Sequence, residues 1–144
     1  MRKIFSFFIM LCSLSLAGRA QDKTLKDQDA LKDLSKKATE LFAHGEIVKA
    51  IEALRPYWPL PKNEIDNVEE KSLTAMNLVT ERFGKFIGTL KIKEQKIADI
   101  AFKEKYLIRL NNTAIRLTFI YYKSNDGWIV NSFKWDDNFI EEFE

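Results

Sequence analysis

Cysteine and histidine are almost absent from this chain of 144 residues, which contains one of each. Cys12 lies in an apolar run near the N-terminus, so the rest of the chain has no disulfide, thiol nucleophile or cysteine metal ligand. The single histidine, His44, excludes a zinc site built from several histidines, and any Ser-His-Asp arrangement would have to use it. His44 precedes Gly45 where a helix is expected to end, so we predict that its ring interacts with the last helix carbonyls.

Glycine and proline are also scarce, at five and three residues. The glycines are spread singly, so there is no glycine-rich phosphate loop. All three prolines fall between Pro56 and Pro61, which predicts a stiff extended connector that ends a helix. Tyr57 and Trp58 lie in this connector. We expect their rings to pack over the edge of the core or, alternatively, to form an aromatic lip over a pocket.

The first twenty residues have the pattern of a secretory signal peptide. Arg2 and Lys3 precede an apolar run over residues 4–16, which is shorter than the roughly 20 residues that span a bilayer. Gly18 and Ala20 supply the small side chains that a signal peptidase needs before a cut at Gln21. Cleavage is favoured over a retained membrane anchor. We therefore predict an exported protein, periplasmic or secreted, and the lack of disulfides favours a Gram-negative bacterium.

Neither sign of charge dominates once residues 1–20 are removed. The full chain has 23 basic and 21 acidic residues. Arg2, Lys3 and Arg19 precede the predicted cut and no acidic residue does, which leaves 20 basic and 21 acidic residues. A general basic surface for nucleic acid is not supported, and we expect no nucleic-acid partner. The remaining 124 residues suit a single domain.

Apolar residues at spacings of three and four predict three helices, which follow a polar segment over residues 21–28 that we expect to be flexible. Pro56 stops the second helix. Asn63 is expected to cap the third and longest helix, and Gly88 to follow its end, although Gly84 leaves the last turn open. The helices are predicted over residues 29–44, 47–54 and 64–86.

After Gly88 the hydrophobic pattern changes to alternation, which predicts strands. Asn111-Asn112 and Ser124 to Gly127 have the composition of tight turns. Together these elements predict a single α+β domain over residues 29–144, with N-terminal helices packed on a three- to four-stranded antiparallel meander in a cone-like form. The strands are predicted over residues 90–94, 97–110, 114–122 and 128–135.

The final stretch, Phe119 to Asp137, is the most specific part of the sequence. A strand, a polar turn reading Asn125-Asp126-Gly127-Trp128, and a strand reading Asn131-Ser132-Phe133 before an Asp pair resemble the ending of small exported bacterial proteins of uncharacterised function. With the order of helices, connector and strands, the chain resembles nuclear transport factor two-like domains, also called cystatin-like. The resemblance implies a curved sheet wrapped on a long helix, with room for a cavity between them. It implies no activity, because this fold serves enzymes, ligand binders and assembly modules.

Few residues are candidates for chemistry. A buried Tyr106, Tyr121 or Asp136 could transfer protons if its surroundings shifted its pKa, although core packing and a strand cap are the favoured interpretations. Asn125-Asp126-Gly127 with Asp136-Asp137 could supply oxygen ligands to calcium, but a β-turn and a solvated strand end are favoured. A basic stretch is interpreted as a solvated sheet face or edge; it comprises Lys91, Lys93, Lys96, Lys103 and Lys105, interleaved with Glu94, Asp99 and Glu104.

The leading hypothesis is a non-enzymatic module that binds a small apolar ligand or a partner protein, without catalytic residues, metal or cofactor. Its site would lie between the connector and the concave face of the sheet, lined by Tyr57, Trp58, Tyr121, Phe133 and Trp135. The first alternative is a small proton-transfer enzyme of the isomerase or dehydratase type, with a pocket between the long helix and the sheet. The second is a homodimeric structural module whose sheets pack through outward rings such as Trp128 and Tyr122. No membrane span is expected after cleavage.

Overall fold

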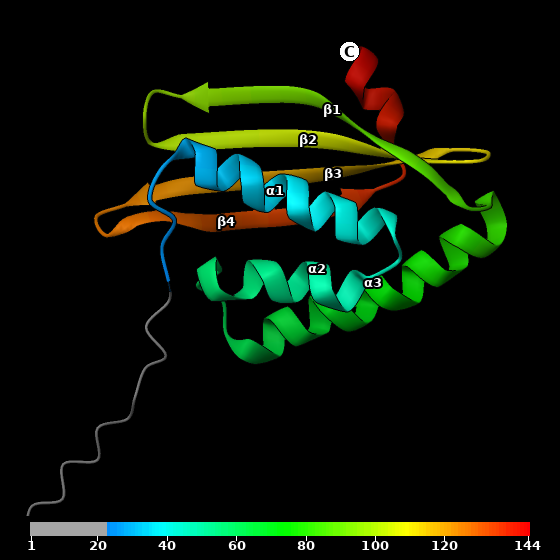
Figure 1. The fold of residues 1–144 in the computed structure, drawn as a ribbon, viewed down its shortest axis with the longest axis horizontal. Coiled ribbons are helices and arrows are strands. Elements are labelled where there is room, and N and C mark those ends of the chain that lie inside the picture. Colours follow the sequence, from blue (N-terminus) through cyan, green and yellow to red (C-terminus); the bar gives the residue numbers. More distant parts are fainter. Residues whose placement is uncertain (1–22) are drawn as a thin grey trace, which may run out of the picture.

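A computed structural model describes residues 23–144 of the chain. The predicted signal peptide and its cut at Gln21 lie outside the described residues. Three helices lie on one face of a four-stranded antiparallel sheet, in which the strands follow one another in chain order (Figure 1). The predicted α+β class is confirmed. The elements are α1 (Gln28–Ala43), α2 (Ile47–Leu54), α3 (Lys62–Phe83), β1 (Phe86–Ile97), β2 (Ala101–Leu110), β3 (Ala114–Ser124), β4 (Gly127–Asp136), and the short 3-10 helices η1 (Arg55–Tyr57) and η2 (Phe139–Phe143).

Helix α1 lies across the sheet and carries the apolar stripe that the sequence predicts. Asp27 caps it by accepting a hydrogen bond from the Ala30 N–H at 2.9 Å. At the other end, Nδ1 of His44 lies 2.6 Å from the carbonyl oxygen of Glu40, which confirms the predicted role of His44 at the helix end. The buried residues of the helix are Leu31, Leu34, Ser35, Ala38, Thr39 and Phe42.

The proline connector differs from its prediction. It was expected to be extended throughout, but η1 (Arg55–Tyr57) continues from α2 as a 3-10 turn, and the extended backbone begins at Trp58. Pro56 fits the first turn of a short helix because that position needs no N–H donor. As a result the indole of Trp58 turns into the core, where it is 4% exposed, while Tyr57 is half-buried.

Helix α3 begins and ends earlier than expected. It starts at Lys62, with Pro61 at the capping position, so the predicted Asn63 cap is wrong. It ends at Phe83, and Gly84 rather than Gly88 follows it with φ of +89°. A Cβ on Gly84 would lie 2.8 Å from Oδ1 of Asn111, which accepts a hydrogen bond from the Lys85 N–H. The turn into β1 therefore requires glycine at this position.

The faces of the sheet follow alternation until a β-bulge interrupts it. Ile120 pairs with Ser132, but Tyr121 pairs with Val130, so Asn131 is an extra residue in β4. This extra residue places Trp128 on the same face as Phe133 and Trp135, contrary to the prediction. Trp128 is 4% exposed and its backbone pairs with Leu25, so it is not an outward ring.

The N-terminal segment of the described chain is held on the fold. The Lys23 N–H donates to the carbonyl of Pro56, and Leu25 is buried where it bridges to Trp128. Residues 23–27 thus contact η1 and the β3–β4 hairpin through backbone and side-chain hydrogen bonds.

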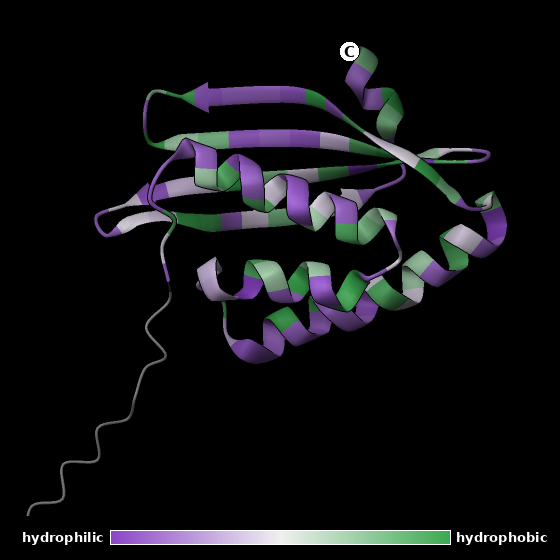
Figure 2. Cartoon of the chain, in the orientation of Figure 1, coloured by the Kyte–Doolittle hydropathy of each residue, from purple (hydrophilic) through white to green (hydrophobic). Residues whose placement is uncertain are grey.

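The hydrophobic core fills the space between the sheet and the helices. Helix α1 packs on β2, β1 and β3, whereas α3 packs on α2. The Trp135 indole N–H donates to Ser72 Oγ at 3.0 Å and joins β4 to α3. Figure 2 shows a strongly hydrophilic stretch on β1 and another on β2, whereas β3 and β4 are more apolar. Within residues 23–144, no long helix covers the opposite face of the sheet, which is called the open face below.

Candidate functional site

The five predicted site residues belong to the core. Trp58 and Phe133 are brought together, with ring centroids 6.3 Å apart in an edge-on arrangement, and Phe133 lies 5.1 Å from Phe119. Trp135 is half-buried and lies 6.2 Å from the ring of Phe42. These rings fill the space between η1, α1 and β4. None of the predicted site residues lines any of the three grooves described below.

Tyr121 lies apart from the other predicted site residues and fastens α1 to the sheet. Its hydroxyl lies 2.7 Å from Ser35 Oγ and 3.3 Å from the carbonyl oxygen of Leu31. Burial raises the pKa of Tyr121 far above its ordinary value. A neutral, hydrogen-bonded phenol in this position is a structural contact between layers.

Glu104 is a fully buried carboxylate that the sequence analysis placed on a solvated face, and that interpretation is wrong. Its Oε1 lies 2.5 Å from Nζ of Lys91, which reaches it from the neighbouring strand. Burial, followed by the charge of Glu104, raises the pKa of Tyr106 to about 12. Burial alone would lower the pKa of Lys91, but hydrogen bonds to Glu104 and Glu94 raise it overall. Glu104 alternates in phase with Phe102 and Tyr106 along β2, and this spacing indicates that it lies on the inner face.

Arg116 organises a charged cluster on the open face. It is 4% exposed, and its guanidinium lies 3.0 Å from Asp136, 2.8 Å from Glu141 and 2.7 Å from Glu142. Burial alone would lower the pKa of Arg116, but these carboxylates raise it. Lys105 also pairs with Glu142. The cluster holds η2 on the sheet, so Asp136 is not the solvated strand end that was expected.

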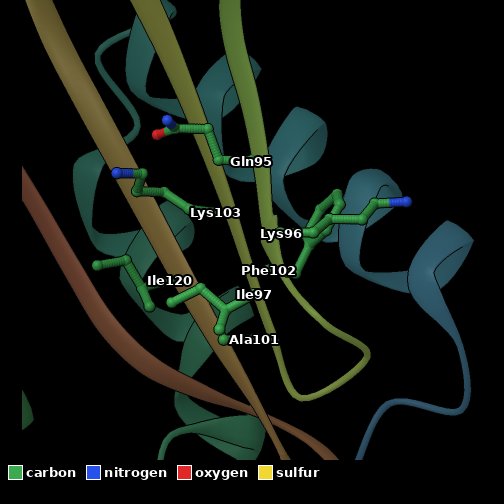
Figure 3. Close-up of a pocket in the computed structure, with 7 residues that line it drawn as sticks. All are labelled: Gln95, Lys96, Ile97, Ala101, Phe102, Lys103 and Ile120. Atoms are coloured by element: carbon green, nitrogen blue, oxygen red, sulfur yellow. The ribbon is translucent and has the colours of Figure 1, made fainter.

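Two shallow grooves lie at the open face, and the first is also lined by side chains of the helix-covered face. The first, of about 320 Å³, lies near the β1–β2 turn; Figure 3 shows Lys96 and Phe102 pointing toward α1 while Ile97, Lys103 and Ile120 lie on the other side. The second, of about 290 Å³, lies between β1, β2 and η2. A third, on α3, has a volume of about 500 Å³ and includes Leu78. The first groove is lined by Gln95, Lys96, Ile97, Ala101, Phe102, Lys103 and Ile120, and the second by Ile92, Lys93, Leu107, Phe139, Glu142 and Phe143.

A row of cross-strand neighbours runs between the two grooves on the open face. The strand register pairs Lys93 with Lys105, Lys105 with Thr118, and Thr118 with Lys134. These four residues are called the lysine row. Lys103 lies beside it, and its pKa is lowered by burial and by the charges of the neighbouring lysines. Within residues 23–144, Lys93, Lys103 and Lys134 form no ion pair, in contrast to Lys105.

The hydroxyl of Thr118 is unsatisfied at the centre of the lysine row. Thr118 is 2% exposed, and its Oγ1 has no hydrogen-bond partner among the described residues. Buried hydroxyls usually find a partner, because an unmade hydrogen bond leaves their desolvation uncompensated. Among the described residues, the open face thus presents three cations without an ion pair and a buried hydroxyl without a hydrogen-bond partner in the same region.

The turn at Asn125-Asp126-Gly127 is a hairpin connection, as predicted. Ser124 Oγ donates to the carbonyl of Gly127 at 2.8 Å, and Thr24 Oγ1 donates to that of Asp126 at 3.0 Å. Within the described part of the chain, no three acidic, cysteine or histidine side chains are grouped so that they could hold a metal ion. Among the same residues, no helix is long and apolar enough to cross a membrane.

Comparisons with known proteins add a likeness of fold. No protein-family model matches the chain. No curated protein matches it. A crystal structure from Campylobacter jejuni, with the provisional description of an NTF2-like transpeptidase, is 19% identical at a TM-score of 0.47 over 69% of this chain and 95% of that one. Another, from Thiobacillus denitrificans, provisionally described as a calcium/calmodulin-dependent protein kinase type II association domain, is 12% identical at a TM-score of 0.43 over 78% and 96%.

Proposed function

We propose that this protein is a non-enzymatic interaction module that binds an acidic ligand or partner through the open face of its sheet. The observation that carries the proposal is the contrast between the faces. The helix-covered face is filled by aromatic rings such as Trp58 and Phe133, whereas the open face has two grooves and unpaired lysines. Exposed concave surfaces with convergent charge are the usual locations of binding sites.

We propose further that the module works outside the cytoplasm. The support is the charged start, short apolar run and small residues of the N-terminal twenty residues. Expression of the full chain with its own N-terminus, followed by cell fractionation and N-terminal sequencing, tests this. Recovery of an uncut chain in the cytoplasm would contradict it.

Site-specific photo-cross-linking tests the binding face. A photoreactive residue replacing Ile120 in the first groove should give an adduct in cells, whereas the same residue replacing Leu78 on α3 is the matched control. The Ile120 adduct should disappear in the Lys93→Glu, Lys134→Glu double variant, because an acidic partner would then face like charge. Adducts from Leu78 alone, or an Ile120 adduct that survives the charge reversal, would refute the assignment.

A proton-transfer enzyme is a second candidate, and the buried Glu104 beside Tyr106 is the observation that favours it. A carboxylate in a dry site can act as a base on an apolar substrate. Two observations argue against an enzyme: Glu104 is paired with Lys91, and it lines none of the three grooves. Solvent-deuterium exchange into a panel of apolar ketones would support this candidate if the wild-type protein accelerates it and Glu104→Gln does not. Equal exchange by both proteins would exclude it.

A further inference from the structure

We propose that the lysine row binds a phosphate- or sulfate-type oxyanion, and that the first groove receives the apolar part of the molecule that carries it. This rests on the proposed function, because it names the ligand chemistry of the same open face. The residues that would contact the oxyanion are Lys93, Lys105, Thr118 and Lys134, with Lys103 beside them.

The register of the sheet places the lysines in one line. Lys93, Lys105 and Lys134 occupy one row across the four strands, with Thr118 between the last two. Adjacent strands lie about 4.8 Å apart, and a lysine stem is long enough for ammonium groups of a row to converge on one anion. A single oxyanion could therefore be reached by several cations at once.

The lysine row also contains an unsatisfied hydroxyl. Thr118 Oγ1 lies buried without a partner at the centre of the row. The hydroxyl can donate or accept a hydrogen bond, whereas the lysines around it can only donate, so an anion bound to the lysines would supply the acceptor for all of them. An oxyanion that parts the lysine stems would accept from the hydroxyl and the ammonium groups together.

The open face already binds a carboxylate of the protein itself. Glu142 of η2 reaches Lys105, an interior member of the row, and Arg116 on the same face. The protein's own tail thus shows that oxygen anions are held on this surface. Glu142 would also compete for Lys105, so its removal should strengthen binding of a second anion.

The apolar part of the ligand would lie in the first groove. The first groove begins beside the row at Lys103 and continues over Ile120 to Ile97 and Ala101, with a volume of about 320 Å³. Its apolar side chains can cover a small ring or short aliphatic group. An organic phosphate or sulfate ester fits both parts, whereas a free anion would use the row alone.

Calorimetric titration at fixed ionic strength tests the proposal with three probes: 1-naphthyl phosphate, inorganic phosphate and 1-naphthol. We expect naphthyl phosphate to bind most tightly, which indicates an ester as the source of the oxyanion. Tighter binding of inorganic phosphate would indicate a free anion in the same row. Binding of naphthol alone, or of no probe at millimolar concentration, would overturn the proposal.

Variants separate this site from general charge attraction. The Lys93→Gln, Lys134→Gln double variant should bind naphthyl phosphate at least about tenfold more weakly. The matched control, Lys36→Gln with Lys37→Gln on α1, makes the same change of charge at exposed positions and should leave affinity unchanged. An equal loss in both double variants would refute a specific site.

Thr118→Val removes the hydroxyl with little change of shape. It should weaken binding several-fold while leaving the unfolding midpoint in urea unchanged or higher, since the hydroxyl has no partner in the free protein. Unchanged affinity would exclude Thr118 from the site. If no probe binds while the Ile120 cross-link persists and remains sensitive to charge reversal, the open face stays a docking surface and the oxyanion assignment fails.

Discussion

Both faces of the sheet carry charged side chains, but these side chains have different roles on the two faces. Strand β2 places Phe102, Glu104 and Tyr106 under α1, and Lys103 and Lys105 on the open face. Under the helix, a buried charge is paired with Lys91; on the open face, several lysines have no partner among residues 23–144. The position of a side chain in the alternation of the strand, and not its polarity, therefore decides which face of the sheet it lies on. Pairing then distinguishes a charge that stabilises the fold from one that is available to a ligand.

The largest expected difference between the faces is in packing. Phe133→Ala should lower the free energy of unfolding by about 3–5 kcal/mol, because Phe133 is buried among Trp58, Phe42 and Phe119. Ile120→Ala, on the half-buried open face, should cost about 1 kcal/mol. Urea unfolding followed by circular dichroism measures both. Equal losses would mean that the open face is packed as tightly as the core.

The next largest effect should come from the one cation that is buried on the open face. Arg116→Gln should lower stability by about 2–3 kcal/mol, because it leaves Asp136 and Glu141 without this cation and Glu142 with Lys105 alone. Arg109→Gln, at an exposed position of the same face, is the control and should change stability by less than about 0.5 kcal/mol. A similar loss in the two variants would contradict the role of Arg116 in holding η2.

The attachment of η2 should also depend on pH. Burial alone would raise the pKa of Glu142, but Lys105 and Arg116 hold it below its ordinary value of 4.5. A carboxyl whose pKa is lowered by folding contributes stability above the unfolded pKa, and this is lost as the pH falls below about 4.5. The stability difference between wild type and Glu142→Gln should therefore shrink on acidification. A difference that stays constant from pH 7 to pH 3 would rule this out.

The smallest effect should come from the lysines beside the row. The pKa of Lys103 is lowered by burial and by Lys105 and Lys93, so its charge opposes folding at neutral pH. Lys103→Gln should raise the free energy of unfolding by no more than about 0.5 kcal/mol. The stability of the wild type should approach that of the variant as the pH rises toward 10.5. Thermal unfolding at pH 7 and pH 10 measures this. A clear loss of stability would show that Lys103 has a structural partner.

Much of the fold could be predicted because it rests on local periodicity. The stripe of α1 and the inward residues of β2 follow from spacing, and the β2–β3 and β3–β4 turns follow from composition, whereas the β1–β2 turn falls inside the strand predicted over residues 97–110. Trp128 was misplaced because one extra residue in a strand, Asn131, reverses the phase without any local signal. The early end of α3 depends on the contact of Gly84 with Asn111, which lies far away in sequence.

The candidate site was harder to predict than the fold. Aromatic residues such as Phe133 are used for cores as readily as for pockets, so their presence did not separate the two. The ion pair of Glu104 with Lys91 and the docking of Glu142 on Lys105 both arise from tertiary contacts between separate elements. Only the cross-strand register shows that Lys93, Lys105 and Lys134 share one row.

The bulges in the outer strands have a consequence for assembly. An open sheet leaves two edges, β1 and β4, whose free backbone groups could extend the sheet into another molecule. β1 carries two extra residues, Ile87 and Ile92, β4 carries one, Asn131, and Leu25 pairs with the start of β4. Irregular and partly covered edges resist being joined strand to strand. If copies of this protein associate, their sheets should therefore meet face to face rather than continue into one another.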